Sequence, residues 1–511
     1  MLMKHFRRFV AAGAFACVAV APAAAQKSKD TIRIAVSANI PLLSIYEFAQ
    51  PDADFFYREL YDNLAFYNEQ TKKFEPRLAK SWKQIDPTTI EFELRDDITF
   101  HSGNKMTADD AVYTLNWTVA PDTKMFLQNR YTGVIKSAEK TGPYTFRLKT
   151  VAPTAIDMLR LRSFFVLDQK VHQAMTDKSE YGRKGVGTGP MVLASFEPGQ
   201  KIVMTPFKDF KLGKPNQISR IEGYMIGDQQ TQIAQLLTQG VDVVRDPSRD
   251  QIEEFSKRPG LAATVAEGNN IVYWTLDATN RSGEAKPLTD VRVRKAIAMA
   301  VDREMIIKTF GLPGQDTKPL DAPCVPAAQI ACVYNVKSPG FNRDQAMQLL
   351  KEAGYEKGFP LTISTRAAGK VWAEAIGGEL RKVGIETFIN TQTDVVLRKD
   401  RSTGKIQSEI STMPILALPD AHLAYQINWA QKTEDYAQDE LVHKLGEQGL
   451  MTTDPAARDK LYAQMFDRVN DQVFMIPVTI VPTAYLHSAE LAFKKTPGYS
   501  FSPRITDFHW K

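Results

Sequence analysis

The chain has 511 residues and a formal net charge of +5, and 43% of its residues are hydrophobic. This length is too great for one hydrophobic core and favours two or more lobes. Three of the 64 basic residues and none of the 59 acidic residues fall in the first 25 positions, so the remaining 486 residues carry a net charge of only +2. A near-neutral balance without a block of lysine or arginine argues against nucleic acid as a partner.

The first 25 residues have the layout of a secretory signal peptide. Residues 1–9 carry three basic side chains, residues 10–20 are almost wholly apolar, and three alanines end at Ala25. We expect cleavage there, so that the mature chain is exported with Gln26 as its first residue. A retained membrane anchor is the alternative, but the apolar run is shorter than the ~20 residues of a membrane helix. Cys17 fits a lipidation site poorly because more apolar residues follow it.

Short strands are expected in the first third of the chain. Apolar and polar residues alternate along Thr31–Val36, Thr88–Arg95 and Thr145–Lys149. This alternation predicts half-buried strands.

Helical periodicity appears between and after these strands. The clearest helix follows Asp290, which suits an N-cap, because Val293, Ala296, Ile297, Ala300 and Val301 fall on one face. Further helices are expected from Ala108 onward, at Gln229–Gln239, at Asp344–Ala353 and at Arg458–Val469. Strands and helices that alternate from end to end predict the α/β fold class.

Two cysteines remain after the signal peptide. Cys324 and Cys332 lie in one Pro- and Ala-rich loop, Pro319–Tyr334. In an oxidising compartment a nearby pair favours a disulfide, and two free thiols are the alternative. A zinc site is not indicated because no second Cys or His pair lies nearby.

Motifs for catalysis and cofactors are missing. No two of the seven histidines have a metal-ligand spacing on one helical turn, and there is no G-x-S-x-G or Walker sequence. Gly185, Gly187 and Gly189 resemble a phosphate loop, but Pro190 follows and the next residues predict a strand. A dinucleotide site needs a helix N-terminus at that point. We therefore expect no metal, no cofactor and no enzyme, although a catalytic triad can be scattered along a chain.

Five stretches carry short motifs in a fixed order. They are Pro76–Trp82 with Phe92–Arg95, Phe100–Gly103 and Thr107–Val112; Gly187–Pro190; Asp290–Ala296 with Ala300–Arg303; Leu349–Tyr355 with Val383–Ile385; and Asp454 with Arg458, Leu461 and Tyr462. Together they resemble bacterial extracellular solute-binding protein family 5, which includes dipeptide-, oligopeptide-, nickel- and opine-binding proteins of ABC importers. The chain departs from the family pattern at Met191, where an aromatic residue is usual.

The resemblance implies a periplasmic binding protein fold with two lobes that close on a ligand by a hinge motion. Lobe I would comprise residues 26–270 and 480–511 with an inserted subdomain at about 75–180, lobe II would comprise residues 271–479, and the crossing strands would lie near Asn270–Trp274 and Ile476–Ile480. The expected partners are the ABC permease subunits of the inner membrane, and the receptor is expected to be a monomer.

Peptide-binding members hold the peptide amino group with an acid in a segment like W-x-x-D-x-x-D-P. The matching stretch here is Met413–His422. If Asp420 matches the later acid, the amino-binding position is Ala417, and the upstream Trp is also absent. This departure disfavours ordinary dipeptides. Two interpretations of Asp420 and His422 stay open: they bind another ligand, such as an opine, a modified peptide or a small metal chelate, or they cap a turn or helix.

Other candidate pocket residues are an arginine and four aromatic residues. Arg366 follows an alternating strand, Leu361–Thr365, at a place where family members often bind a ligand carboxylate. The planar guanidinium suits that task, and a surface arginine at a strand end is the alternative. The aromatic candidates are Trp274, Trp372, Tyr425 and Trp429, each of which would also suit a core.

The leading hypothesis is therefore a periplasmic solute receptor of an ABC importer for a peptide-like or small polar solute. A receptor of the same fold for a metal chelate, haem or an opine is the alternative. A periplasmic hydrolase that uses this fold is a third possibility, for which no sequence pattern nominates a nucleophile or base.

Overall fold

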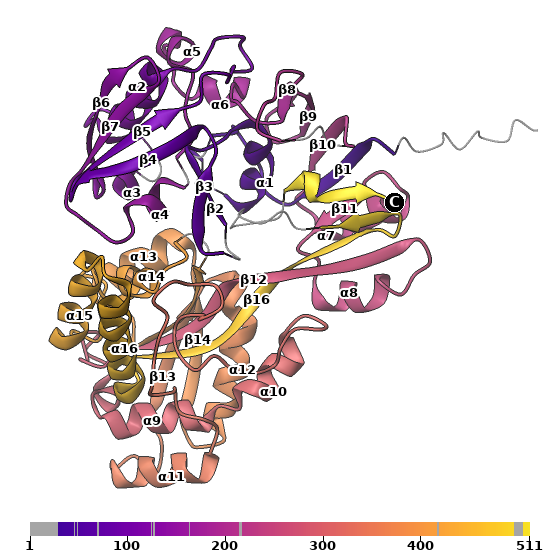
Figure 1. Cartoon of the computed structure of the whole chain (residues 1–511). Coiled ribbons are helices and arrows are strands. Elements are labelled where there is room, and N and C mark those ends of the chain that lie inside the picture. Colours follow the sequence, from indigo (N-terminus) through magenta and orange to yellow (C-terminus); the bar gives the residue numbers. More distant parts are fainter. Residues whose placement is uncertain are drawn as a thin grey trace, which may run out of the picture.

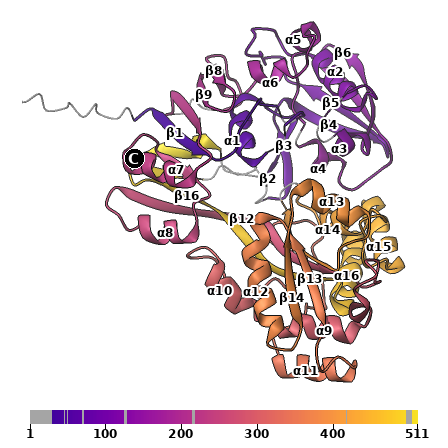
Figure 2. The same cartoon turned by 180° about the vertical axis from the view of Figure 1, so that it is seen from behind.

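The computed structural model describes residues 29–511 except 45, 49, 69–70, 124, 126–127, 163, 214–216, 416–417 and 495–503. The expected signal peptide, residues 1–25, lies outside the described residues. Two lobes are joined by two long strands, β12 (Leu261–Leu276) and β16 (Met475–Ser488), as Figures 1 and 2 show from opposite sides. The predicted α/β class and two-lobed architecture are confirmed.

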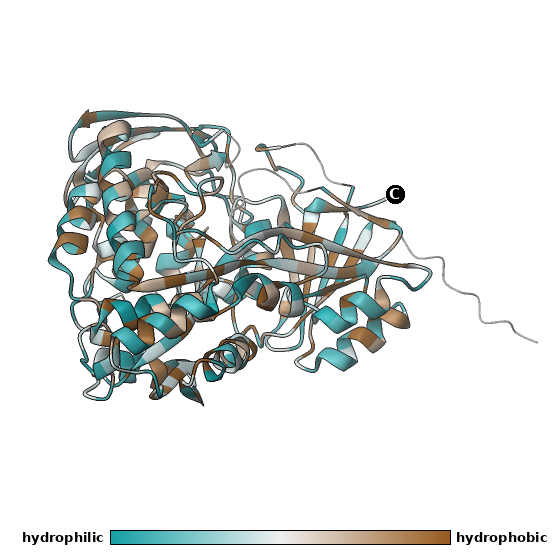
Figure 3. Ribbon diagram, turned by 90° about the horizontal axis from the view of Figure 1, so that it is seen from below, coloured by the Kyte–Doolittle hydropathy of each residue, from teal (hydrophilic) through white to brown (hydrophobic). Residues whose placement is uncertain are grey.

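One ten-stranded mixed sheet runs through both lobes, in the order β14-β13-β15-β12-β16-β11-β1-β10-β9-β8. The strands confined to lobe I are β1 (Thr31–Val36), β8 (Met191–Glu197), β9 (Lys201–Pro206), β10 (Arg220–Met225) and β11 (Val243–Arg245). Those confined to lobe II are β13 (Pro360–Thr365), β14 (Glu386–Thr391) and β15 (Ser408–Pro414). Viewed from below, the long strands β12 and β16 run from one lobe into the other (Figure 3).

β1 is buried on both faces, whereas its sequence pattern predicted a half-buried strand. Ile32 and Ile34 pack into the main core of lobe I, and Ala35 packs into a separate cluster on the other face. The reason is the central position of β1, which pairs in parallel with β10 on one side and β11 on the other. Parallel strands are usually covered on both faces.

The two long strands change lobe beside a glycine. Leu261–Val265 of β12 pairs with β16 in lobe I, and Asn270–Leu276 pairs with β15 in lobe II. Register shifts flank Gly268, and a Cβ there would lie 1.8 Å from Cγ2 of Ile480. Gly268 therefore lies between the part of β12 that pairs in lobe I and residues 270–274, which already pair with β15 in lobe II.

A second, antiparallel sheet forms within lobe I. Its order is β4-β5-β7-β6, with β4 (Ala79–Asp86), β5 (Thr89–Leu94), β6 (Ile135–Gly142) and β7 (Thr145–Thr150). Phe92 and Phe146 stack on it with ring centroids 5.1 Å apart. α2 (Ala108–Val119) packs against β6, and Thr107 starts this helix with a capping box that includes Asp110.

The remaining elements complete the two lobes. Lobe I holds α1 (Pro51–Leu60), α3 (Gln128–Thr132), α4 (Asp157–Leu161), α5 (Gln169–Ala174), α6 (Glu180–Lys184), α7 (Gln229–Leu237), α8 (Arg249–Phe255), the hairpin β2 (Ala65–Asn68) and β3 (Lys73–Pro76), and the pair β17 (Leu491–Phe493) and β18 (Phe508–Trp510). Lobe II holds α9 (Val291–Ala300), α10 (Arg303–Phe310), α11 (Arg343–Glu352), α12 (Lys370–Arg381), α13 (Asp394–Ser402), α14 (His422–Asn428), α15 (Glu440–Met451) and α16 (Pro455–Gln472). Within the described part of the chain, no helix has the length and hydrophobicity needed to cross a bilayer.

The predicted helices are present, with small differences at their ends. Asp290 caps α9 through the amide of Arg292, and the predicted apolar stripe of this helix is buried. α16 begins three residues before the predicted start. Asp454 accepts a hydrogen bond from the Ala457 amide, and Pro455 occupies the first helical position, where proline is favoured.

The glycine-rich segment after α6 serves packing. Gly187 and Gly189 lie against the backbone at the end of α1, where a Cβ on either residue would come within 2.5 Å of a carbonyl oxygen. Nδ1 of His101 accepts a hydrogen bond from the Gly187 amide, and its Nε2 lies 3.0 Å from the Gly189 oxygen. The segment leads into β8, so no helix N-terminus is available there for a phosphate.

Cys324 and Cys332 form a disulfide with their Cα atoms 5.8 Å apart, and both are buried. We predict the same bond in protein recovered from the periplasm. Neither thiol should then react with an alkylating reagent before reduction, and mass spectrometry of the alkylated protein measures this. The enclosed loop is short, so the stabilisation should be modest, about 2–3 kcal/mol. Alkylation of both thiols without a reductant would contradict the prediction.

Candidate functional site

The carboxyl ends of β13 and β14 lie at the same edge of the lobe II sheet. These two strands pair in parallel, and β13 also pairs in parallel with β15. In open α/β sheets, ligands bind outside the carboxyl ends of the strands. α13, which follows β14, lies on the side of lobe II that faces lobe I (Figures 1 and 2). This edge is therefore the candidate site.

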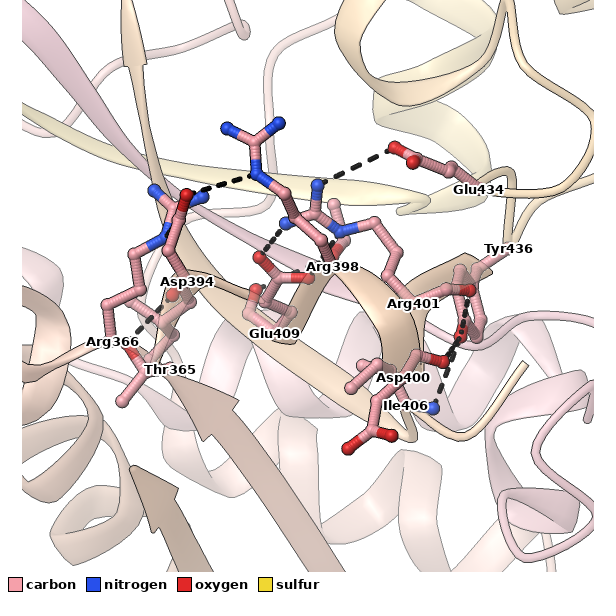
Figure 4. Close-up of polar contacts among 12 residues, drawn as sticks. Thr365, Arg366, Asp394, Arg398, Asp400, Arg401, Ile406, Glu409, Glu434 and Tyr436 are labelled. Atoms are coloured by element: carbon pink, nitrogen blue, oxygen red, sulfur yellow. Dashed lines mark hydrogen bonds and ion pairs between the residues drawn. The ribbon is translucent and has the colours of Figure 1, made fainter. Parts of the chain in front are cut away.

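Arg366 stands at this edge, directly after β13. Its Nε lies 2.5 Å from Oδ1 of Asp394, the first residue of α13, and a third of the Arg366 side chain is exposed. Arg398, one turn further along α13, contacts the other carboxylate oxygen of Asp394 at 3.1 Å. Figure 4 shows the two arginines on either side of the shared carboxylate. A partly exposed ion pair of this kind can exchange its carboxylate partner at little cost.

A second ion pair lies deeper in lobe II. Nε of Arg401 donates to Glu409 at 2.8 Å, and Nη2 contacts the other oxygen of the same carboxylate. Glu434 lies 3.7 Å from Nη1 (Figure 4). Burial alone would lower the pKa of Arg401, but its interactions with neighbouring groups, chiefly Glu409, together have a larger effect in the opposite direction. The pKa of Arg401 is therefore raised. Paired, buried charges of this kind fix local structure and are not available to a solute.

Arg401 and Glu409 line a small cavity together with Trp429 and Tyr436. Its volume is about 20 Å³, room for roughly one water molecule. The Tyr436 hydroxyl donates to the Arg401 carbonyl at 3.0 Å and accepts from the Ile406 amide at 3.2 Å. This cavity is too small for a peptide-sized solute.

Asp420 is fully buried and paired with an arginine. Its two carboxylate oxygens each lie 2.6 Å from one terminal nitrogen of Arg458, in a bidentate ion pair. Oδ1 also accepts a hydrogen bond from the His422 amide at 2.8 Å. Of the two interpretations left by the sequence, this geometry favours the turn cap, and it adds an ion pair that the sequence did not predict.

His422 is buried beside Asp420. Its Nδ1 lies 3.0 Å from the Tyr462 hydroxyl, and the ring of Tyr425 is 5.4 Å away. Burial, reinforced by the charges of Arg160 and Arg458, lowers the pKa of His422 to about 3. The imidazole is therefore neutral at physiological pH.

The aromatic candidates lie in hydrophobic cores. Trp274 and Trp372 belong to the cluster between the lobe II sheet and its covering helices, and Tyr425 and Trp429 belong to the cluster formed with α14, α15 and α16. Ala417, the predicted amino-binding position, lies outside the described residues. Thus Asp420, His422, Tyr425 and Trp429 come together, but as core, and Arg366 stands apart at the exposed edge.

Sequence reasoning missed the polar partners of these residues. Asp394, Arg401 and Glu409 belong to no motif, and the strand that carries Glu409, β15, has a mostly polar sequence that gives no sign of its burial. Arg458 entered the argument as part of a family motif and not as the partner of Asp420. Among the residues described by the structure, no three His, Cys, Asp or Glu side chains are grouped as metal ligands.

The family model of bacterial extracellular solute-binding proteins, family 5 (middle region), matches residues 73–427. The chain belongs to this family. A probable ABC transporter periplasmic-binding protein of Escherichia coli, SapA, is 26% identical over 366 residues, which cover 65% of this chain and 64% of the relative. Heme-binding protein A of Haemophilus influenzae is 24% identical over 386 residues, which cover 69% of this chain and 68% of the relative.

Solved structures of substrate-binding proteins share the fold. The ABC transporter substrate-binding protein CtaP of Listeria monocytogenes superposes with a TM-score of 0.82 at 17% identity, covering 95% of this chain and 100% of that structure. At this identity the likeness concerns the fold alone. The names of the curated relatives refer to different solutes, among them oligopeptides, nickel and dipeptides. Family membership therefore leaves the solute open.

Proposed function

We propose that this chain is the periplasmic solute receptor of an ABC importer, binds its solute between the two lobes, and acts as a monomer with the permease subunits of the inner membrane. The observation that carries the proposal is the continuous sheet in which β12 and β16 join both lobes beside Gly268. A hinge there would bring lobe I onto the edge of lobe II that holds Arg366. The receptor role involves no chemistry on the solute.

The proposed solute is a peptide-like or small polar molecule with a carboxylate, and Arg366 is its proposed partner. Asp394 already holds the guanidinium at the exposed edge, so a solute carboxylate can take its place without burying an unpaired charge. Asp420 is committed to Arg458 and cannot also hold an ammonium group. This commitment favours the alternative of a solute without a free amino group, such as an opine or an N-acylated peptide.

Native mass spectrometry of protein isolated from the periplasm tests the proposal. We expect a fraction of the molecules to carry an additional mass that is released on unfolding and is then identified by its fragments. Incubation of the solute-free protein with candidate peptides distinguishes a receptor from a hydrolase, because a receptor leaves the peptides intact. Cleaved peptides would instead support a hydrolase.

Export by a cleaved signal peptide is part of the proposal. The mature protein is expected to begin at Gln26 and to be recovered in the periplasmic fraction, because the small residues before this position suit the signal peptidase. N-terminal sequencing of the recovered protein measures this. A mature chain that still begins with Met1 would remove the argument for cleavage.

A further inference from the structure

Three apolar side chains of lobe I are buried in a core of lobe II. Tyr67 of β2 and Ile156 and Leu159 of the α4 segment belong to the same hydrophobic cluster as Tyr462 and the disulfide. Ile156 is fully buried, and Tyr67 and Leu159 are nearly so. Separation of the lobes would expose all three to water, at a cost proportional to the apolar area exposed.

Two hydrogen bonds cross between the lobes at the same place. The amide of Ala155, just before α4, donates to the carbonyl of Leu450 near the end of α15 at 3.1 Å. Nζ of Lys72, in the β2–β3 turn, donates to the carbonyl of Pro326 at 3.2 Å. An attractive charge interaction accompanies them between Arg160 of α4 and Asp420 of lobe II: burial lowers the pKa of Arg160, and the carboxylates of Asp157 and Asp420 oppose that shift.

The surface that receives α4 is built on the disulfide loop. The amide of Ile330 donates to the Pro419 carbonyl, and the Ala421 amide donates to the Ile330 carbonyl, each at 2.9 Å. Nε2 of Gln329 donates to the Asp420 carbonyl at 3.0 Å. The Cys324–Cys332 bond closes this loop, so the disulfide and the Asp420–Arg458 pair brace one rigid surface.

A further interlobe contact lies beside the crossing strands. Nη1 of Arg249 in α8 of lobe I donates to the carbonyls of Lys308, Thr309 and Gly311 at the end of α10 of lobe II, at 2.7–2.9 Å. The last carbonyls of a helix lack partners within the helix and carry partial negative charge, so a cation there is favourable. The lobes are thus held together on the hinge side as well.

We infer that α4 and the β2–β3 hairpin form a latch that docks on the disulfide-braced surface of lobe II and biases the receptor toward closure. The latch consists of protein groups on both sides, so its contribution to closure is independent of the solute. A solute then adds to an existing bias, and its apparent affinity depends on the fraction of receptor that is closed.

Leu159→Ala and Leu161→Ala are a matched pair that tests the latch. Both residues lie on α4 and both are buried, but Leu159 packs in the lobe II cluster and Leu161 packs in the core of lobe I. The measurements are the radius of gyration of solute-free protein by small-angle X-ray scattering and the hydrogen exchange of the Ala155 amide. The Val151 amide, bonded to Val134 inside the subdomain, serves as the reference amide.

In Leu159→Ala we expect the Ala155 amide to exchange about tenfold faster relative to Val151, since large-to-small changes at buried contacts are costly. The radius of gyration should also increase. In Leu161→Ala neither the exchange ratio nor the radius should change. If Leu159→Ala does not fold, Lys72→Met replaces it. In Lys72→Met the exchange ratio of Ala155 to Val151 and the radius of gyration should both increase, but by smaller amounts than expected for Leu159→Ala.

The latch would be overturned if the two leucine variants behaved equally, or if Leu159→Ala kept the wild-type exchange ratio. No solute is added, so this outcome is independent of the proposed transport role.

Discussion

Asp420→Ala is expected to destabilise the protein by about 3–5 kcal/mol, the usual cost of removing one partner of a buried ion pair. Arg458 would keep its charge in a buried site, with Nε bonded to the Gly449 carbonyl and the two terminal nitrogens left without their carboxylate. The His422 amide would also lose its acceptor. Urea unfolding followed by circular dichroism measures the loss.

Two control variants separate this effect from a general effect of losing a carboxylate. Asp394→Ala removes an acid that is half exposed, and it should change stability by no more than about 1 kcal/mol. The double variant Asp420→Leu with Arg458→Met replaces both charges by apolar groups and should recover much of the loss. If Asp420→Ala is as stable as the wild type but loses its solute, Asp420 is a binding residue and not a structural one.

The elements of the fold could be predicted where a local signal was strong. Asp290 and the apolar stripe after it define α9, and the alternation around Phe92 and Phe146 defines β5 and β7 of the four-stranded sheet. Burial on both faces of β1 could not be predicted, because it follows from the parallel neighbours β10 and β11, which lie more than 180 residues away in sequence.

The candidate site could likewise be predicted only in part from the sequence. Arg366 could be placed at a strand end from the alternation before it, but its partner Asp394 is brought there by the parallel pairing of β13 and β14. Asp420 lies 38 residues from Arg458 in sequence, and no local pattern joins them. Trp274 and Trp372 could not be assigned to core or pocket, because both environments bury an aromatic side chain equally well.

Plain dipeptides are expected to bind weakly, with dissociation constants well above the micromolar range. The ammonium group of an enclosed peptide loses its water and needs a charged partner. The sequence aligns Ala417 with the position that supplies this partner in peptide-binding family members, and a methyl group cannot replace a carboxylate. Asp420 is the only acid between Ser411 and Thr433, and both of its oxygens already contact Arg458.

Isothermal titration calorimetry with dipeptides, oligopeptides, N-acylated peptides and opine-like compounds measures the preference. A carboxylate-bearing compound that binds should lose about 10- to 100-fold in affinity in Arg366→Gln, the range expected for one charged hydrogen bond. Arg398→Gln is the matched control, since Arg398 contacts the same Asp394 but is about two-thirds exposed, and it should leave the affinity unchanged.

Each outcome of the calorimetry has a separate structural meaning. Submicromolar binding of a plain dipeptide would show that the alignment with Ala417 is wrong and that another acid holds the amino group. Equal affinities in wild type and Arg366→Gln would show that the carboxylate binds elsewhere. Because Arg366 is a third exposed and its partner Asp394 is half exposed, their ion pair contributes little to stability. The variant should therefore fold normally, and the lost affinity can be assigned to the solute contact.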